Sequence, residues 1–383
     1  IPPQTEHDLS LKDVTLAKAL KSIGYATIHV GKWHLGDAPH YPEAQGFDVN
    51  IGGTLWGAPN SYHQPFKGSE VFGDYRYVPG LGLGKPGQYL TDRLADEAIK
   101  MIDEAGDQPF YLNLCFHAPH APIQPKPELV EHYRQKLTPQ MKHQRPEYAA
   151  MVQTLDENVG RVLRHLDEKH LTDHTIVVFA SDNGGYINKD GGKNVTNNSP
   201  LRSGKGSLYE GGIRVPVIVR WPGVTPGGGV CDEPIFCTDF FPTLADAAGV
   251  PATNRGDSGR DGVDLLPVLK DPQAHLGRDA LYFHYPHYYA TTTPVGAIRQ
   301  GDWKLLEYFE TGKLELYNIK NDLSETNDLS KQDPQRVAAL HQALIDWRKS
   351  VGAQMPTLRA AAAFDGAQPL AAAEEMRSVV DED

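Results

Sequence analysis

Residues 24–36 read GYATIHVGKWHLG, a β-rich run that ends in a polar cluster bracketed by glycines. Residues 25–30 have the composition of a short strand, and residues 31–36 have that of a loop. Upstream, residues 10–22 carry apolar side chains at helical spacing, and Gly24 suits a helix stop. The stretch therefore predicts a helix, a strand and then a loop rich in ionisable groups.

The same order of elements occurs twice more along the chain. The helix, strand and loop of these copies are expected at 91–105, 109–116 and 117–122, and again at 146–169, 174–180 and 181–185. Helices that alternate with short, nearly continuous apolar strands are typical of a mostly parallel sheet with helices on both faces. The predicted class is α/β.

The pattern changes toward the C-terminus. A further strand at 215–221 and a helix at 238–248 precede closely spaced strand-like stretches at 280–285, 296–299, 303–308 and 313–317, with a closing helix at 335–349. Turn signals between these stretches predict a small antiparallel α+β subdomain. The expected organisation is an α/β domain over 1–275, the subdomain over 276–352, and an Ala-rich, acidic tail over 353–383.

Composition narrows the classes of partner. The chain has 383 residues, with 37 basic and 49 acidic side chains and a net charge of −12. An acidic surface repels phosphate backbones, and no Lys/Arg block or membrane-length apolar run is present. We expect neither a nucleic-acid nor a membrane partner, and the oligomeric state stays open.

Chemically useful side chains follow each of the three predicted strands. In open parallel sheets, ligands bind at the carboxyl ends of the strands, so residues distant in sequence are expected to meet there in one pocket. Taken singly, a lysine at a strand end is usually just solvated, and a histidine more often makes a local hydrogen bond, so the prediction rests on the three loops together. The side chains that the three loops supply are Lys32 and His34, His117 and His120, and Asp182 and Asn183.

The three loops together suggest an anion held next to a metal, because two of them supply ammonium or imidazole groups and the third supplies a carboxylate and an amide. Asp182 and Asn183 offer only oxygen ligands, which suit a hard cation such as calcium or magnesium, although Asp-Asn-Gly-Gly is equally a tight turn. Downstream, residues 204–216 read GKGSLYEGGIRVP and place Lys205 among glycines that let the backbone approach a ligand. Glu210 and Arg214, four residues apart, are interpreted as a structural pair.

In this order, the 24–36, 117–122, 181–185 and 204–216 segments resemble the type I, formylglycine-dependent sulfatases of the alkaline phosphatase superfamily. Bacterial glycan and aryl sulfatases are the most similar. The resemblance implies an alkaline-phosphatase-like fold, a calcium ion, and hydrolysis of the sulfate ester of a sulfated saccharide or aryl sulfate. It also implies export to the periplasm or secretion, by analogy.

The resemblance assigns a role to six residues. Asp182 and Asn183 ligate calcium, and Lys205 binds the sulfate. Lys32 contacts the sulfate and the formylglycine, and His34 assists the formylglycine. The histidine before the second Ala-Pro, His120, contacts the sulfate and protonates the leaving oxygen, whereas His117 has no clear counterpart.

The nucleophile motif of that family, C/S-x-P-S-R, does not occur in this chain. Cys115, Cys231 and Cys237 lack the Pro and Arg at the required offsets, and residues 198–202, NSPLR, have Asn198 in place of the modifiable residue. The Asp-Asp pair that completes the calcium site is also absent, since Asp13 and Asp37 are isolated in the sequence. The expectation is that the chain is the C-terminal portion of a sulfatase, inactive alone and with an incomplete calcium site.

Two other functions remain open from the sequence. One is a metal-dependent phosphatase or phosphodiesterase of the same superfamily, although such sites favour a histidine where Asn183 stands. The other is a pseudo-sulfatase that binds sulfated glycans without catalysis. Residues 284–289, HYPHYY, offer stacking faces and donors that suit a saccharide, or equally the packing of a core.

Overall fold

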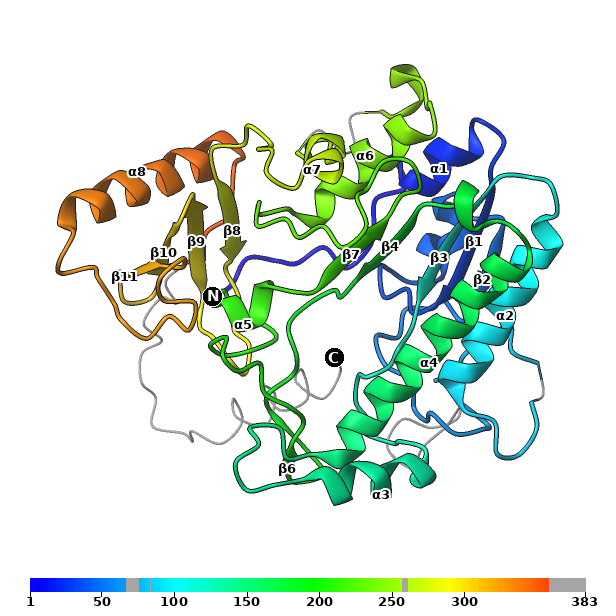
Figure 1. The fold of residues 1–383 in the computed structure, drawn as a ribbon. Coiled ribbons are helices and arrows are strands. Elements are labelled where there is room, and N and C mark those ends of the chain that lie inside the picture. Colours follow the sequence, from blue (N-terminus) through cyan, green and yellow to red (C-terminus); the bar gives the residue numbers. More distant parts are fainter. Residues whose placement is uncertain (67–75, 83, 257–260, 358–383) are drawn as a thin grey trace, which may run out of the picture. The chain divides into compact units, whose positions relative to one another are not determined.

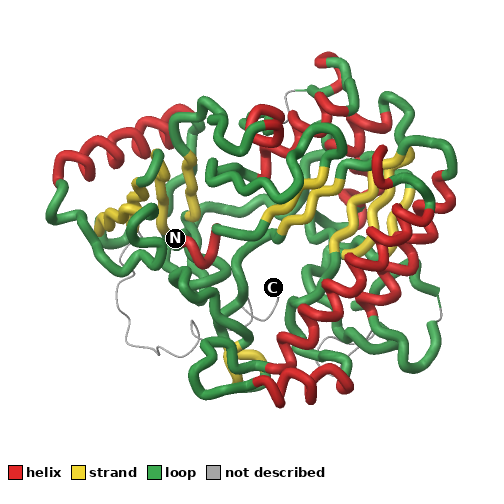
Figure 2. Tube along the Cα trace, in the orientation of Figure 1, coloured by secondary structure: helices red, strands yellow, loops and turns green. Residues whose placement is uncertain are grey.

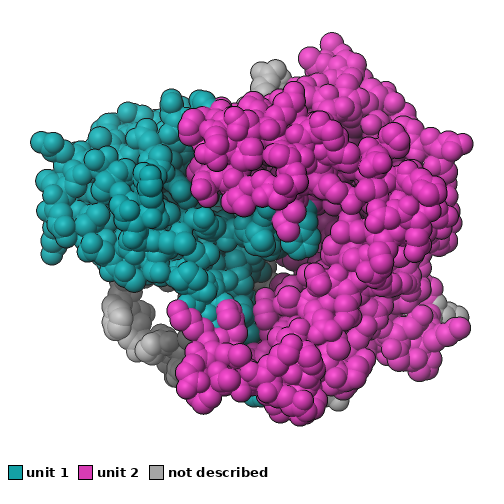
Figure 3. All heavy atoms as spheres, in the orientation of Figure 1, with its two compact units in different colours: residues 1–5, 179–217, 277–383 teal, residues 6–178, 218–276 magenta. Residues whose placement is uncertain are grey.

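The computed structural model describes residues 1–66, 76–82, 84–256 and 261–357. The chain divides into two compact units, each made from segments distant in sequence (Figure 3). Unit 1 comprises residues 1–5, 179–217 and 277–383, and unit 2 comprises residues 6–178 and 218–276. Most of the predicted tail, residues 358–383, lies outside the described residues.

Unit 2 contains the predicted parallel sheet. Strands β1 (Ala26–Gly31), β2 (Val49–Ile51) and β3 (Phe110–Cys115) are ordered β2-β1-β3, and both pairings are parallel. The register places Gly31 of β1 opposite Cys115 of β3. The loops that follow these two strands therefore start at the same edge of the sheet, as the sequence predicted.

Helices cover both faces of this sheet. Ile28 and Val30 of β1 pack in one core cluster with residues of α2 (Leu90–Ala105) and α4 (Pro146–Glu168). Tyr111 of β3 packs instead with α1 (Leu16–Lys21) and α6 (Phe240–Ala247). Figure 1 shows α2 and α4 running along the sheet.

The first helix is shorter than predicted. It begins at Leu16 rather than near residue 10, because the Thr15 hydroxyl accepts the backbone N–H of Lys18 at 3.1 Å and caps it there. Residues 11–13 form a turn.

Strand β4 (Val177–Ala180) does not belong to the β2-β1-β3 sheet. It pairs with β7 (Val217–Arg220) in a separate two-stranded sheet, at the positions where the chain passes from one unit to the other. Two helices of unit 2 were not predicted, α3 (Pro127–Lys136) and α7 (Leu266–Lys270). The apolar residues of α3, Leu129, Val130 and Tyr133, do recur at helical spacing, but none of them is buried, and the helix is only ten residues long.

Unit 1 holds the predicted antiparallel subdomain. Strands β8 (Leu281–Tyr285), β9 (Val295–Gln300), β10 (Trp303–Tyr308) and β11 (Lys313–Asn318) are ordered β11-β10-β9-β8. Helix α8 (Pro334–Ser350) covers this sheet through Leu340 and Leu344 (Figures 1 and 2).

The rest of unit 1 is mostly loop. It includes the short hairpin of β5 (Lys189–Asp190) and β6 (Lys193–Asn194), and the single turn α5 (Glu210–Ile213). Throughout the described residues, every helix is too short or too polar to span a bilayer.

Candidate functional site

The first group of predicted site residues, here called the histidine cluster, lies at the carboxyl ends of β1 and β3 in unit 2. It consists of Lys32, His34, His117 and His120. The backbone N–H of Lys32 donates to the carbonyl oxygen of Cys115 at 2.8 Å, so the parallel pairing continues one residue into the loop. Lys32 and the histidines after β3 are thereby brought together.

His34 is held in an uncommon backbone conformation. Its φ is +56°, in the left-handed region that non-glycine residues rarely adopt. Its N–H donates to the carbonyl oxygen of Thr54 at 3.0 Å, and a Cβ on Gly57 would lie 2.5 Å from the His34 ring. Such conformations persist where surrounding structure imposes them, and they concentrate at functional sites. The 54–57 segment thus fixes an exposed histidine.

His120 has a defined tautomer and a fixed backbone. Its Nδ1 lies 2.8 Å from the carbonyl oxygen of Ala121, which only accepts, so Nδ1 carries the hydrogen. The Tyr62 hydroxyl donates to the carbonyl oxygen of His120 at 3.0 Å. Burial raises the pKa of Tyr62 well above its ordinary value, so this donor keeps its proton. Nε2 is then the nitrogen through which His120 can pass a proton to a ligand.

His117 is the member that sequence reasoning left without a role. Its side chain is buried, and its carbonyl oxygen accepts the N–H of His120 at 2.9 Å. Its Nδ1 has no hydrogen-bond partner among the residues that the structure describes. Burial, and then the nearby charges of Lys32, His120 and His29, lower its pKa to about 3. His117 is therefore a neutral imidazole near the Lys32 ammonium. This state depends on burial, which the sequence does not reveal.

This buried imidazole predicts a pH-dependent stability. The folded-state pKa of about 3 lies below the ordinary 6.5, so between these values the unfolded chain binds more protons and the folded state loses stability as the pH falls. From pH 7 to pH 5 the loss is about 2 kcal/mol. Urea unfolding of wild type and His117→Asn at both pH values measures it. Between pH 7 and pH 5, the free energy of unfolding of the wild type should fall by about 2 kcal/mol more than that of the variant. Equal falls in the two proteins would refute the assignment.

The second group, here called the aspartate–lysine cluster, lies entirely in unit 1. It consists of Asp182, Asn183 and Lys205. The N–H of Lys205 donates to the carbonyl oxygen of Gly185 at 3.2 Å. The N–H of Gly184 donates to the carbonyl oxygen of Gly212 at 2.9 Å. These bonds bring the 181–185 loop and the 204–212 segment side by side.

Asn198, which the sequence suggested was part of a plain connection, joins the two segments. Its Oδ1 accepts the N–H of Gly185 at 2.9 Å, and its Nδ2 donates to the carbonyl oxygens of Gly185 and Ser203, both at 2.9 Å. One side chain thus makes three hydrogen bonds to two backbone segments. The position that resembled a misplaced nucleophile has a structural role.

The orientation of Asn183 fits a hard cation. Its Nδ2 donates to the carbonyl oxygen of Gly184 at 2.9 Å, which leaves Oδ1 as the oxygen that can ligate. Asp182 is exposed, and its Oδ1 accepts the N–H of Asn183 at 2.8 Å. The pair offers carboxylate and amide oxygens, the ligands that calcium prefers. Because calcium takes six to eight oxygens, these two residues could supply only part of a coordination shell.

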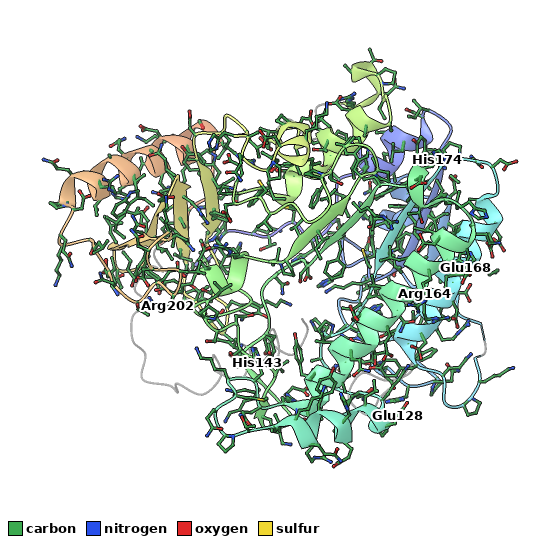
Figure 4. The ribbon with its side chains drawn as sticks, in the orientation of Figure 1. Glu128, His143, Arg164, Glu168, His174 and Arg202 are labelled. Carbon is green, nitrogen blue, oxygen red and sulfur yellow. The ribbon has the colours of Figure 1, made fainter. Side chains whose placement is uncertain are left out.

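A buried ion network anchors the segment that carries Lys205. Lys304 of β10 is 0% exposed, and its ammonium lies 3.0 Å from Glu210 and 2.9 Å from Glu325. Burial raises the pKa of both carboxyl groups, and the attraction of Lys304 lowers it. At Glu210 the attraction outweighs burial, so the pKa of Glu210 is lowered. At Glu325 burial outweighs the attraction, so the pKa of Glu325 is raised. Arg202, labelled in Figure 4, donates to the Tyr317 hydroxyl at 3.0 Å.

Glu210 pairs mainly with Lys304, a partner that spacing along the sequence did not indicate. The predicted Glu210–Arg214 pair is present at 3.5 Å, but the Arg214 side chain is 48% exposed. Asp37, interpreted from the sequence as isolated, lies beside Asp8 and His40 on an exposed surface, with ligand atoms within 4.8 Å of one another.

Comparison with known proteins identifies the family. The family model described as Sulfatase matches residues 2–250, and that of the N-sulphoglucosamine sulphohydrolase C-terminal region matches residues 204–350. The chain belongs to the sulfatase family, hydrolases of the alkaline phosphatase superfamily.

Individual relatives agree with this assignment. A sulfatase of Formosa agariphila is 31% identical over 87% of this chain and 69% of its own length. Human N-acetylgalactosamine-6-sulfatase is 30% identical over 75% of this chain and 56% of its own length. The chain thus spans between about half and two thirds of these relatives.

Solved structures share the fold. Ps i-CgsB, crystallised in complex with k-i-k-neocarrahexaose, superposes with a TM-score of 0.74 at 31% identity, covering 91% of this chain and 77% of that one. BT4656, solved in complex with D-glucosamine-2-N,6-O-disulfate, gives a TM-score of 0.70 at 22% identity, covering 90% and 83%. The α/β prediction with a C-terminal antiparallel sheet is confirmed.

Proposed function

We propose that this chain provides binding and proton-transfer groups for hydrolysis of the sulfate ester of a saccharide. The observation that carries the proposal is the histidine cluster. A lysine and an imidazole of defined tautomer follow paired parallel strands, in a member of the sulfatase family. The similarity to Ps i-CgsB, which was crystallised in complex with k-i-k-neocarrahexaose, supports a carbohydrate substrate.

Each residue is assigned a chemical task. Negative charge grows on the leaving oxygen when a sulfate ester is attacked at sulfur, so fixed cations stabilise the transition state. Lys32 and Lys205 bind sulfate oxygens, and His34 assists the nucleophile. His120, when both ring nitrogens carry a proton, gives the Nε2 proton to the leaving oxygen and keeps the Nδ1 proton on its hydrogen bond to Ala121. Histidine suits such general-acid work near neutral pH.

Calcium is the proposed cofactor, held in part by Asp182 and Asn183. When bound it supplies positive charge that stabilises the sulfate oxygens. The proposed nucleophile is a formylglycine, for which these 383 residues contain no C/S-x-P-S-R motif. We therefore propose that this chain binds sulfate esters but does not turn them over.

Incubation with an aryl sulfate and calcium tests this proposal. The expected result is no release of sulfate above background, together with protection of the folded chain against heat by the sulfated ligand. Calcium-dependent release would overturn the nucleophile assignment. A matched aryl phosphate serves as the comparison, since stronger protection by the phosphate ester would favour a phosphatase of the same superfamily.

A further inference from the structure

The hairpin tip between β8 and β9, residues 286–294, packs against the segment that carries Lys205. The Thr291 hydroxyl donates to the carbonyl oxygen of Lys205 at 2.7 Å. Gly206, with a φ of +87°, lies so close to the Tyr289 ring that a Cβ there would approach it to 2.1 Å. All these residues belong to unit 1. The tip and the proposed sulfate-binding lysine are therefore parts of one local structure.

The tip has a defined conformation. Tyr289 and Thr292 exchange two backbone hydrogen bonds, each of 3.1 Å, and Pro286 at its start is buried. These contacts order the backbone of the turn that carries Tyr288, whose side chain is 50% exposed. An exposed aromatic ring on an ordered turn loses little conformational entropy when a ligand covers it.

Tyr288 is paired with a carboxylate. Its hydroxyl donates to Oε1 of Glu310, and this hydrogen bond raises the pKa of Tyr288, so the ring stays neutral at physiological pH. The pair presents an apolar ring face beside an anionic acceptor. A sugar ring offers the complementary surface, an apolar C–H face edged by hydroxyl donors, whereas a second sulfate group would be repelled by Glu310.

We propose that Tyr288 and Glu310 form an outer saccharide subsite, which binds the sugar ring that adjoins the sulfated one. The sulfate is bound at Lys205, and the neighbouring ring stacks on Tyr288 and donates a hydroxyl to Glu310. The inference rests on the proposed function, and it specifies the substrate as an oligosaccharide rather than a sulfated monosaccharide.

Calorimetric titration of the 383-residue chain with two probes tests the subsite. The probes are k-i-k-neocarrahexaose and a sulfated galactose. Tyr288→Ala should weaken hexasaccharide binding about tenfold, or about 1.4 kcal/mol, and leave binding of the monosaccharide unchanged. Tyr288→Phe keeps the ring and should retain most of the affinity, whereas Glu310→Gln should show a smaller, hexasaccharide-specific loss. Tyr133→Ala, in α3, is the control for loss of a partly exposed tyrosine.

The outcomes separate the subsite from the proposed function. Failure of the wild-type chain to bind either probe would contradict the proposed function itself. Normal hexasaccharide binding by Tyr288→Ala would overturn the subsite alone. An equal loss for both probes would also overturn it, because Tyr288 would then act by supporting Lys205.

Discussion

Replacement of Lys304 by methionine is expected to destabilise the fold by about 3–5 kcal/mol, the usual cost of removing one partner from a buried ion group. The ammonium of Lys304 is fully buried between Glu210 and Glu325. Without it, Glu325 loses the cation beside it, and Glu210 keeps only the longer ion pairs with Arg214 and Arg299, both at 3.5 Å. The N–H of Glu210 also donates to Glu325 Oε2 at 2.7 Å, so the damage should extend to the segment that carries Lys205. Urea denaturation followed by circular dichroism measures the loss.

The matched control is Lys320→Met. Lys320 is 71% exposed and lies 3.8 Å from Asp302, so its removal should cost less than about 1 kcal/mol. The double variant Lys304→Met with Glu325→Gln should recover part of the stability, because one buried negative charge is then removed. If Lys304→Met costs no more than the control, the network does not anchor unit 1.

Removal of either proposed sulfate-binding lysine should weaken binding of a sulfate ester by roughly 10- to 100-fold, since a charge-assisted hydrogen bond is worth about 1.5–3 kcal/mol. Lys32→Ala and Lys205→Ala each remove one such cation, from the histidine cluster and from the aspartate–lysine cluster respectively. Calorimetric titration with a sulfated oligosaccharide provides the affinities. Both variants should unfold at nearly the wild-type urea concentration, since neither lysine belongs to the buried network.

The control for these variants is Lys100→Ala in α2. Its side chain is 60% exposed and makes long surface ion pairs, 3.9 Å to Glu97 and 3.6 Å to Glu104. It changes the net charge by the same amount as the other two substitutions. If all three variants lose affinity equally, the effect is one of overall charge, and the assignment of Lys32 and Lys205 fails.

Local patterns in the sequence predicted most of the regular elements. The apolar runs at 109–116 and 303–308 correspond to β3 and β10. Such strands can be predicted because their signal, a run of apolar and aromatic residues, lies within a few consecutive residues. The predicted start of α1 was wrong by several residues, because the helix begins at the Thr15 cap and not where the apolar spacing begins. Local signals missed α3, whose short apolar pattern of Leu129, Val130 and Tyr133 is the signal from which it could have been predicted.

The supporting contacts of the site were beyond the reach of local reasoning. Tyr62 lies 58 residues from His120, and Lys304 lies 94 residues from Glu210, so no motif connects either pair. The burial of His117 likewise depends on packing around β1 and β3. Loop composition identified which side chains carry chemistry, whereas their protonation and orientation come from tertiary contacts.

The most direct test of the central claim compares one oligosaccharide in its sulfated and chemically desulfated forms. Calorimetric titration of the wild-type chain in calcium should show at least about tenfold tighter binding of the sulfated form. This preference should shrink in Lys32→Ala and in Lys205→Ala. Equal affinity of the wild-type chain for both forms would contradict the assignment of these clusters to a sulfate ester.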